Sequence, residues 1–187
     1  MKSKPLWIRL DSMASNLTFG IRKLITFYIS VNLAIITSVI ALNAASQKGQ
    51  ITNLPIPRFV SLKTSKGNIR RGPSLSHKID WVLVVPNIPL KVVEEYEHWR
   101  RVVDYEGASG WIHYSLISGA RTAMVLKDME SLYKKPSYDS VIKANIQVNA
   151  IGHLGECNKN WCFLRFYNEK GWVNREFLWG LTKGEIR

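Results

Sequence analysis

The pattern of apolar and polar residues changes sharply near residue 47. Residues 24–47 contain no charged side chain and are mostly apolar, and the preceding segment, 1–23, holds five basic side chains against a single acid. Small residues, 43–46, end the apolar stretch. A basic flank, an apolar stretch and small residues in this order are typical of a secretory signal. We therefore predict that residues 1–45 direct export.

Two questions about residues 1–45 stay open in the sequence. A helix that spans a bilayer needs about 20 largely apolar residues, so an uncleaved signal anchor is the rival of a cleaved signal peptide. Four polar residues dilute the stretch and favour cleavage, namely Ser30, Asn32, Thr37 and Ser38. Met13 is a second candidate start besides Met1, because it would leave a short basic flank. The predicted location is the periplasm or the exterior; the alternative is the inner membrane, facing the periplasm and touching the bilayer only through this segment.

Beyond residue 47, short apolar runs alternate with turn residues, and no spacing of three and four residues is sustained. This pattern is typical of β structure. Residues 46–57 contain Pro55 and Pro57, which favour an extended backbone, and predict a linker or a lead-in strand. The predicted strands are 58–62, 81–85, 91–96, 99–104 and 110–113 in the first half, and 131–133, 141–144, 147–151, 161–167 and 171–174 in the second. We expect an all-β fold of small barrels.

The two halves of this β region resemble each other. Four landmarks recur at a nearly constant spacing along the chain: Trp99 and Trp161, Gly110-Trp111-Ile112 and Gly171-Trp172-Val173, Gly119 and Gly180, Pro73-Ser74 and Pro136-Ser137. Such repetition predicts two tandem domains, residues 58–120 and 121–187. At about 60 residues each unit is near the smallest that folds alone, and closure into a barrel protects its strand edges.

The repeated tryptophans and glycines have structural interpretations. Trp99 begins one strand of a predicted hairpin and Trp111 lies in the return strand, and large aromatic side chains mostly pack in small cores. Gly110 and Gly171 each precede a tryptophan, which suits a bulge or a close approach of two backbones. These residues are expected to be landmarks of the fold.

The chain has two cysteines, Cys157 and Cys162, which flank a predicted hairpin tip. Two cysteines that face each other across neighbouring strands of an exported protein most simply form a disulfide. A metal site would need more ligands than the neighbouring His153, and a redox-active pair usually has closer spacing. We predict a structural disulfide and no metal.

The charge of the chain narrows the class of partner. The formal net charge is +12, and residues 46–187 keep 21 basic and 13 acidic side chains, a net charge of +8. A basic protein is often a nucleic-acid binder, but an exported chain would rarely meet nucleic acid. An anionic partner in the envelope and simple solvation of the surface are the two remaining explanations.

Both halves resemble the bacterial SH3 domain, a short-stranded β-barrel of exported and wall-associated proteins. In the first half the resemblance is to the SH3-like exported proteins of alphaproteobacteria and covers residues 54 to about 120. The matching segments are 54–63, Asn68-Ile69-Arg70-Arg71-Gly72-Pro73-Ser74, 79–82, 99–102, Gly110-Trp111-Ile112-His113 and 116–119. In the second half the resemblance rests on the repeated landmarks and the cysteines. Residues 86–89 depart from the glycine turn usual in the family. The resemblance implies a ligand-binding or scaffolding module; some relatives bind cell-wall peptides or assist wall hydrolases.

The histidines of the chain do not indicate an enzyme. His77, His98, His113 and His153 are scattered, and none lies in a recognised catalytic motif. Catalysis would need a nucleophile, a base and a stabilising group, or a metal cluster. We therefore expect no catalytic residues and no cofactor.

The leading hypothesis is a non-catalytic envelope binding module that recognises peptidoglycan or its peptides. Trp81 and Tyr96 are candidates to stack on glycan or peptide, and Arg70, Arg71 and Arg100 are candidates to pair with carboxylates. Core packing of the aromatic side chains and solvation of the arginines are the alternatives. The second hypothesis is an adaptor that binds another envelope protein or a host molecule.

Overall fold

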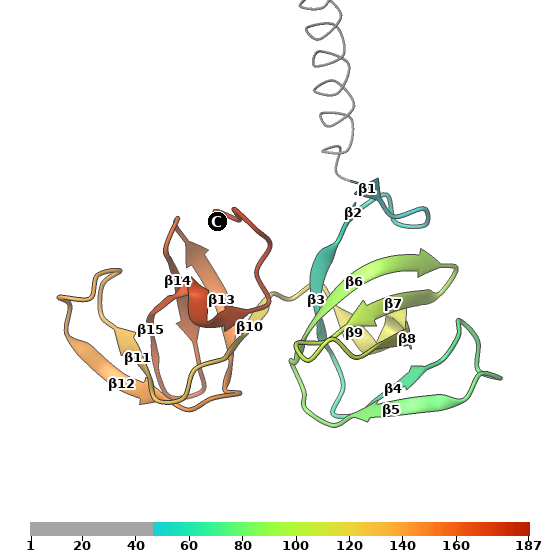
Figure 1. The fold of residues 1–187 in the computed structure, drawn as a ribbon, viewed down its shortest axis with the longest axis horizontal. Coiled ribbons are helices and arrows are strands. Elements are labelled where there is room, and N and C mark those ends of the chain that lie inside the picture. The colour runs from blue at the N-terminus through green and yellow to red at the C-terminus, as the bar shows by residue number, and fades with distance from the viewer. Residues whose placement is uncertain (1–46) are drawn as a thin grey trace, which may run out of the picture. The chain divides into compact units, whose positions relative to one another are not determined.

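The computed structural model describes residues 47–187 (Figure 1). The predicted signal or anchor segment, residues 1–45, and both candidate starts, Met1 and Met13, lie outside the described residues. Among residues 47–187, no helix has the length and apolar character needed to cross a membrane.

Two antiparallel sheets of seven strands each make up most of the described chain. The first contains β3 (Arg58–Leu62), β4 (Gly67–Arg70), β5 (Ile79–Leu83), β6 (Pro89–Tyr96), β7 (Trp99–Val103), β8 (Ser109–His113) and β9 (Ile117–Ser118). The second contains β10 (Thr122–Val125), β11 (Glu130–Tyr133), β12 (Ile142–Ile146), β13 (Ile151–Cys157), β14 (Trp161–Arg165), β15 (Lys170–Asn174) and β16 (Leu178–Trp179). Short 3₁₀ helices, η1 (Tyr114–Leu116) and η2 (Arg175–Phe177), precede the last strand of each sheet.

The two sheets have the same topology. The strand order is β5-β4-β8-β7-β6-β3-β9 in the first and β12-β11-β15-β14-β13-β10-β16 in the second. In Figure 1 each sheet curls over its own interior, the first coloured teal to yellow and the second orange to red. The predicted all-β fold and the internal repeat are confirmed.

Each sheet encloses its own apolar core. Leu62, Leu90 and Ile112 are among the buried side chains of the first core, and Leu132 and Leu164 are among those of the second. The cores follow from the alternation of apolar and polar residues along the strands, because successive side chains of a strand point to opposite faces. Isolated sheets of this size need such a buried face to be stable.

The prediction of a strand at residues 147–151 is wrong. Residues 147–150 form a turn, in which Asn149 has a φ of 67°, and β13 begins only at Ile151. Asparagine tolerates this left-handed conformation better than most residues, which favours a turn there. Strands β4 and β10 were not predicted, because β4 has only four residues and the four residues of β10 are all buried, so β10 does not alternate between buried and exposed positions.

The segment expected as a linker or lead-in strand, residues 46–57, contains a short hairpin. Strand β1 (Gln47–Lys48) pairs antiparallel with β2 (Pro55–Ile56). The N–H of Gly49 donates to the carbonyl oxygen of Leu54 at 2.8 Å and closes the turn. We call residues 47–56 the N-terminal hairpin.

Gly110 and Gly171 lie where two backbones approach closely, as predicted. A Cβ on Gly110 would lie 2.9 Å from the carbonyl oxygen of Arg70, and a Cβ on Gly171 would lie 2.7 Å from that of Tyr133. Neither approach leaves room for a side chain, so glycine is required at both positions. The two contacts are the same contact repeated in each sheet.

The predicted disulfide between Cys157 and Cys162 is confirmed. The two residues are directly opposite each other in the β13–β14 ladder. The bond therefore closes the tip of this hairpin across its two strands.

The turn before β6, within residues 86–89, lacks the expected glycine, and an asparagine takes its conformation. Asn87 takes the glycine-like conformation, with a φ of 63°. Its carbonyl oxygen accepts a hydrogen bond from the Thr122 hydroxyl of β10 at 2.7 Å. This turn therefore makes a contact with the first strand of the second sheet.

Candidate ligand-binding groove

A groove of about 490 Å³ opens on the first sheet. One wall is the loop between β4 and β5, and the other is the turn between β6 and β7. Seven residues line it: Pro73, Ser74, Leu75, Glu97, His98, Trp99 and His113. Its volume lies within the range of small-ligand sites, and its lining combines apolar groups with a few polar ones, as such sites do. We call this site the groove.

Aromatic rings form the floor of the groove. Trp99 and His113 are directly opposite each other in the β7–β8 ladder, and their ring centroids are 5.4 Å apart. His98 adds a third ring, 6.0 Å from His113, and Tyr114 lies 4.9 Å from His113. Such a cluster offers stacking surface together with imidazole hydrogen-bonding groups.

Arg70 holds the loop wall of the groove in shape. Its guanidinium donates to the carbonyl oxygens of Leu75 at 3.0 Å and His77 at 2.7 Å. The loop presents Leu75 outward with 76% of its surface exposed. Arg70 therefore supports the wall through the loop backbone.

Arg71 forms an exposed salt bridge at the base of the same loop. Its guanidinium lies 2.8 Å from the Asp80 carboxylate. The hydrogen bond from Arg71 lowers the pKa of Asp80 below its ordinary value. Because the pair is exposed, it contributes little to stability.

The two aromatic side chains predicted to bind ligand lie outside the groove. Trp81, on β5, is 57% exposed and borders a small hollow of about 20 Å³ beside Ile69. Tyr96, at the end of β6, is 51% exposed and borders a separate hollow beside the N-terminal hairpin. The structure does not bring the five predicted residues together on one surface.

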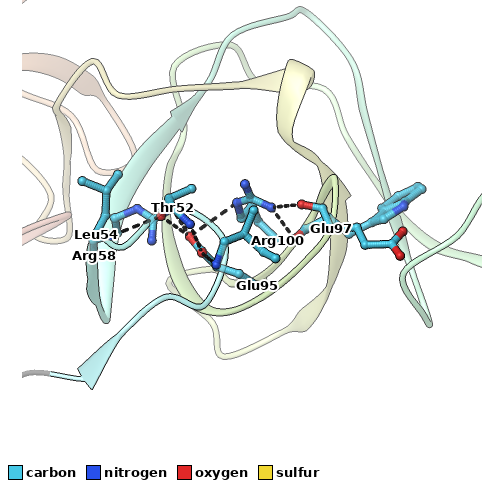
Figure 2. Close-up of polar contacts among 8 residues, drawn as sticks. Thr52, Leu54, Arg58, Glu95, Glu97 and Arg100 are labelled. Carbon is cyan, nitrogen blue, oxygen red and sulfur yellow. Dashed lines mark hydrogen bonds and ion pairs between the residues drawn. The ribbon is translucent and has the colours of Figure 1, made fainter.

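Glu95 is the centre of a buried ion cluster behind the groove (Figure 2). Its carboxylate is fully buried and lies 2.7 Å from Arg58. It accepts hydrogen bonds from the backbone N–H groups of Ile51 and Thr52, at 3.1 and 2.9 Å, and from the Thr52 hydroxyl at 2.7 Å. Burial by itself raises the pKa of Glu95, but the hydrogen bonds from Thr52, Arg58 and Ile51 outweigh it and lower the pKa from 4.5 to about 2.

Arg100 is the second arginine of the cluster and is only 6% exposed. Its guanidinium donates to the carbonyl oxygens of Glu97 and Trp99, both at 2.8 Å, and its Nε lies 3.5 Å from the Glu95 carboxylate. Burial lowers the pKa of Arg100, although the charge of Glu95 opposes this effect. Arg100 therefore faces the groove turn from inside, and we do not include it among ligand-contacting residues.

The second sheet has the same framework, but the equivalent position is filled. The Tyr138 ring lies 4.8 Å from that of Trp161 and 5.9 Å from that of Tyr133. Its hydroxyl accepts a hydrogen bond from the Asn174 side chain at 2.5 Å. Tyr138 follows Pro136-Ser137 as Leu75 follows Pro73-Ser74. The aromatic residue of this loop therefore packs on Trp161, whereas a groove lies between Leu75 and Trp99 in the first sheet. Trp99 is nevertheless as buried as Trp161.

None of the seven groove residues was predicted to bind ligand, and three of them, Pro73, Ser74 and Trp99, were predicted only as landmarks of the repeat. The two histidines of the groove are far apart in the chain, and only the pairing of β7 with β8 brings them together. The repeat contained the missing signal, since His98 precedes one landmark tryptophan and His113 follows the second. Among residues 47–187, no group of three or more His, Cys, Asp or Glu side chains is placed to hold a metal ion.

Three solved structures illustrate what the fold is similar to. NlpC2 from Trichomonas vaginalis is 12% identical, with a TM-score of 0.32, over 70% of this chain and 51% of that one. NlpC1 from the same organism is 12% identical, with a TM-score of 0.31, over 75% and 51%. An NlpC/P60 family protein from Bacillus cereus is 13% identical, with a TM-score of 0.31, over 65% and 55%. This chain thus spans about half the length of each.

The sequence comparisons with known proteins identify a family but no individual relative. No curated protein matches the chain. The family described as the bacterial SH3 domain matches twice, over residues 63–119 and 127–180. These segments cover every strand of the two sheets except the first of each, β3 and β10, and we now call the two sheets the first and second domains. With two such domains covering more than half of its length, the chain belongs to the bacterial SH3 domain family.

Proposed function

We propose that this chain is a non-catalytic binding module of the cell envelope and that the groove of its first domain holds the ligand. The observation that carries the proposal is the difference between the two domains. A groove borders Trp99 in the first domain, whereas Tyr138 packs on Trp161 in the second, and both tryptophans are themselves buried, at 8% and 6% exposure. A binding site needs accessible surface, which favours the groove of the first domain as the site.

The chemistry of the groove fits a peptide or glycan of the cell wall. The rings of His98 and His113 are exposed or half-buried and offer faces on which a sugar ring or an apolar side chain stacks, whereas Trp99 packs against His113 from the buried side. The imidazoles can donate hydrogen bonds to carbonyl oxygens, and the Glu97 carboxylate can pair with an ammonium group. Wall peptides carry both kinds of group, and so peptidoglycan is the ligand class that we propose.

The disulfide supports a location outside the cytoplasm. Disulfides persist in oxidising compartments and are rare in the reducing cytosol. The Cys157–Cys162 bond therefore agrees with the predicted export. The periplasm or the exterior is the location that we propose.

The hydroxyl groups around the groove support a non-catalytic role. The Ser74 hydroxyl pairs with that of Ser76 at 2.6 Å. The Nδ1 of His113 lies 2.8 Å from the Ser115 hydroxyl, but it also accepts from the Ser115 N–H as the cap of η1. Among residues 47–187 no carboxylate hydrogen-bonds to His113, so the orienting third group of a catalytic triad is lacking there.

Retention on purified peptidoglycan tests the proposal. We expect the protein to be retained at low salt, and His98→Ala to weaken retention severalfold. His153→Ala is the matched control, because this exposed histidine lies on the second domain; its retention should equal that of the wild type. Absence of retention of the wild-type protein at low salt would overturn the proposal.

A protein partner is the second candidate function, and the edge strand β5 favours it. Large apolar side chains are exposed on β5 and the loop that follows: Ile79, Trp81, Val82, Val84 and Val85. β5 is the last strand in the order of its sheet, and apolar edge strands are prone to pair with an extended segment of another chain. Crosslinking in intact cells tests this function. A protein partner without retention on peptidoglycan would favour it.

A further inference from the structure

We propose that the N-terminal hairpin positions the groove, acting through the buried carboxylate of Glu95 and the guanidinium of Arg100. The inference rests on the proposed function of the groove and adds a regulatory contact to it. Neither residue touches the groove surface, so both are positioning residues. The chain of contacts runs from Thr52 through Glu95 and Arg100 to the carbonyl oxygen of Glu97 (Figure 2).

The first link joins the hairpin to Glu95. Three donors of the hairpin point at the carboxylate, namely the N–H groups of Ile51 and Thr52 and the Thr52 hydroxyl. A Cβ on Gly49 would collide with the same carboxylate. The hairpin backbone is thus closely fitted around one charged group. Hydrogen bonds to a buried charge are stronger than those between neutral groups.

The second link joins Glu95 to the groove turn. Glu95 and Arg100 are opposite each other in the β6–β7 ladder, and the Arg100 guanidinium reaches past Glu95 to the carbonyl oxygens of Glu97 and Trp99. Arg58 faces the carboxylate from β3. Two arginines therefore share one carboxylate, and each depends on it for its charge to be compensated in the interior.

The groove turn needs such support because its backbone is strained. Glu97 has a φ of 44°, in the left-handed region that non-glycine residues rarely adopt. Residues held there persist only where the surroundings fix them. The hydrogen bond from Arg100 to the Glu97 carbonyl oxygen fixes this peptide unit. Glu97 and His98 form the wall of the groove that this bond orients.

The second domain has a covalent clamp at the same position. Cys157 and Cys162 follow Glu95 and Arg100 at the same spacing by which Trp161 follows Trp99, and each pair is directly opposed across the equivalent ladder. Both pairs therefore lie beside the first landmark tryptophan of their domain. A disulfide needs no outside contact, whereas the Glu95–Arg100 pair is completed by the N-terminal hairpin. This difference is the reason that the hairpin can control the first domain alone.

The test uses the full chain and a change confined to the hairpin. Thr52→Val removes one donor to Glu95, and Thr52→Ser restores it with little change in size. We expect Thr52→Val to shift the amide NMR signals of Glu97 and His98 and the indole signal of Trp99, and to weaken retention on peptidoglycan about threefold. Thr52→Ser should return both to wild-type values. The Trp161 indole signal should not move in either variant.

A second pair of variants tests whether Glu95 couples the hairpin to the groove turn. Glu95→Gln removes the buried charge, and Glu94→Gln removes an exposed charge on the same strand as its matched control. Glu95→Gln should raise hydrogen exchange both at Thr52 and at Glu97 to Trp99, and Glu94→Gln should raise it at neither. Faster exchange at Thr52 with unchanged exchange and signals at Glu97 to Trp99 would overturn the inference. If the wild-type protein is not retained on peptidoglycan, the proposed function fails, while the NMR and exchange results still decide the coupling.

Discussion

The two domains share one arrangement of strands but differ in the pair of residues that lies beside the first landmark tryptophan. The landmark tryptophans and glycines occupy the same strands, and the close approach at Gly110 is repeated at Gly171. The opposed pair beside the tryptophan, however, is Glu95 with Arg100 in the first domain and Cys157 with Cys162 in the second. The comparison teaches that this ladder position is cross-linked in both domains, by charge in one and by a covalent bond in the other.

The loop between β4 and β5 also differs from the equivalent loop between β11 and β12. Leu75 leaves the first groove open, whereas Tyr138 packs on Trp161 and closes the equivalent position. The domain with the open groove is thus the one whose clamp depends on a neighbouring segment. The second domain has a covalent clamp, and Tyr138 packs on its tryptophan. Both features suit a structural partner of the first domain.

The largest expected effect comes from breaking the ion pair of the first domain. Arg100→Met should destabilise this domain by about 3–5 kcal/mol, because it leaves the Glu95 carboxylate buried with one partner fewer. The matched control is Arg101→Met, whose side chain is exposed on the next residue and should cost less than about 1 kcal/mol. Hydrogen exchange resolved by residue measures both domains separately. Equal losses in the two variants would contradict a clamp.

The next largest expected effect is that of acid on the stability of the first domain. The pKa of Glu95 is lowered from 4.5 to about 2 in the folded state, so its contribution to stability is fully present above pH 4.5 and is lost as the pH falls towards 2. The shift corresponds to about 3 kcal/mol. Exchange at Thr52 and the first core should therefore increase through this range in the wild type, and Glu95→Gln should remove most of this pH dependence. The disulfide does not titrate. In the second domain, burial by itself raises the pKa of Glu185, but hydrogen bonds from Arg121 and Thr182 outweigh it and lower the pKa, so the Glu95→Gln variant is what isolates the effect of Glu95.

Loss of the disulfide should have a smaller effect, and it should destabilise the second domain and not the first. The bond closes a short loop, since only five positions separate Cys157 from Cys162, and such loops contribute about 2 kcal/mol in the chain-entropy model. Cys157→Ser with Cys162→Ser should destabilise the second domain by about that amount and leave the first domain unchanged. Denaturant unfolding with exchange of the Leu132 and Leu62 amides as reporters measures this. A loss confined to the first domain would break the comparison.

The sequence indicated the framework well because its signals are local. Trp99, Gly110, Trp111 and their repeats are read from spacing alone, and the cysteine pair from its hairpin context. The groove and the ion cluster were missed for a different reason. Arg100 was predicted to meet a ligand because alternation does not show that the hairpin and Glu95 cover it. Likewise, the groove depends on how the loop side chains pack, and only the folded loops show that Tyr138 contacts Trp161 while a groove remains between Leu75 and Trp99.

The smallest effects, and the sharpest test of the open groove, come from exchanging the two loop residues. Leu75→Tyr should fill the groove beside Trp99, as Tyr138 packs on Trp161, and weaken retention on peptidoglycan about tenfold, which corresponds to about 1.4 kcal/mol. Tyr138→Leu should cost about 1 kcal/mol in the second domain through lost ring contacts and should not weaken retention, because the second groove takes no part in binding. If Leu75→Tyr retains full binding, the ligand lies elsewhere on the first domain. If Tyr138→Leu weakens binding as strongly as Leu75→Tyr, the second domain is part of the site, and the division of labour between an open and a closed domain is wrong.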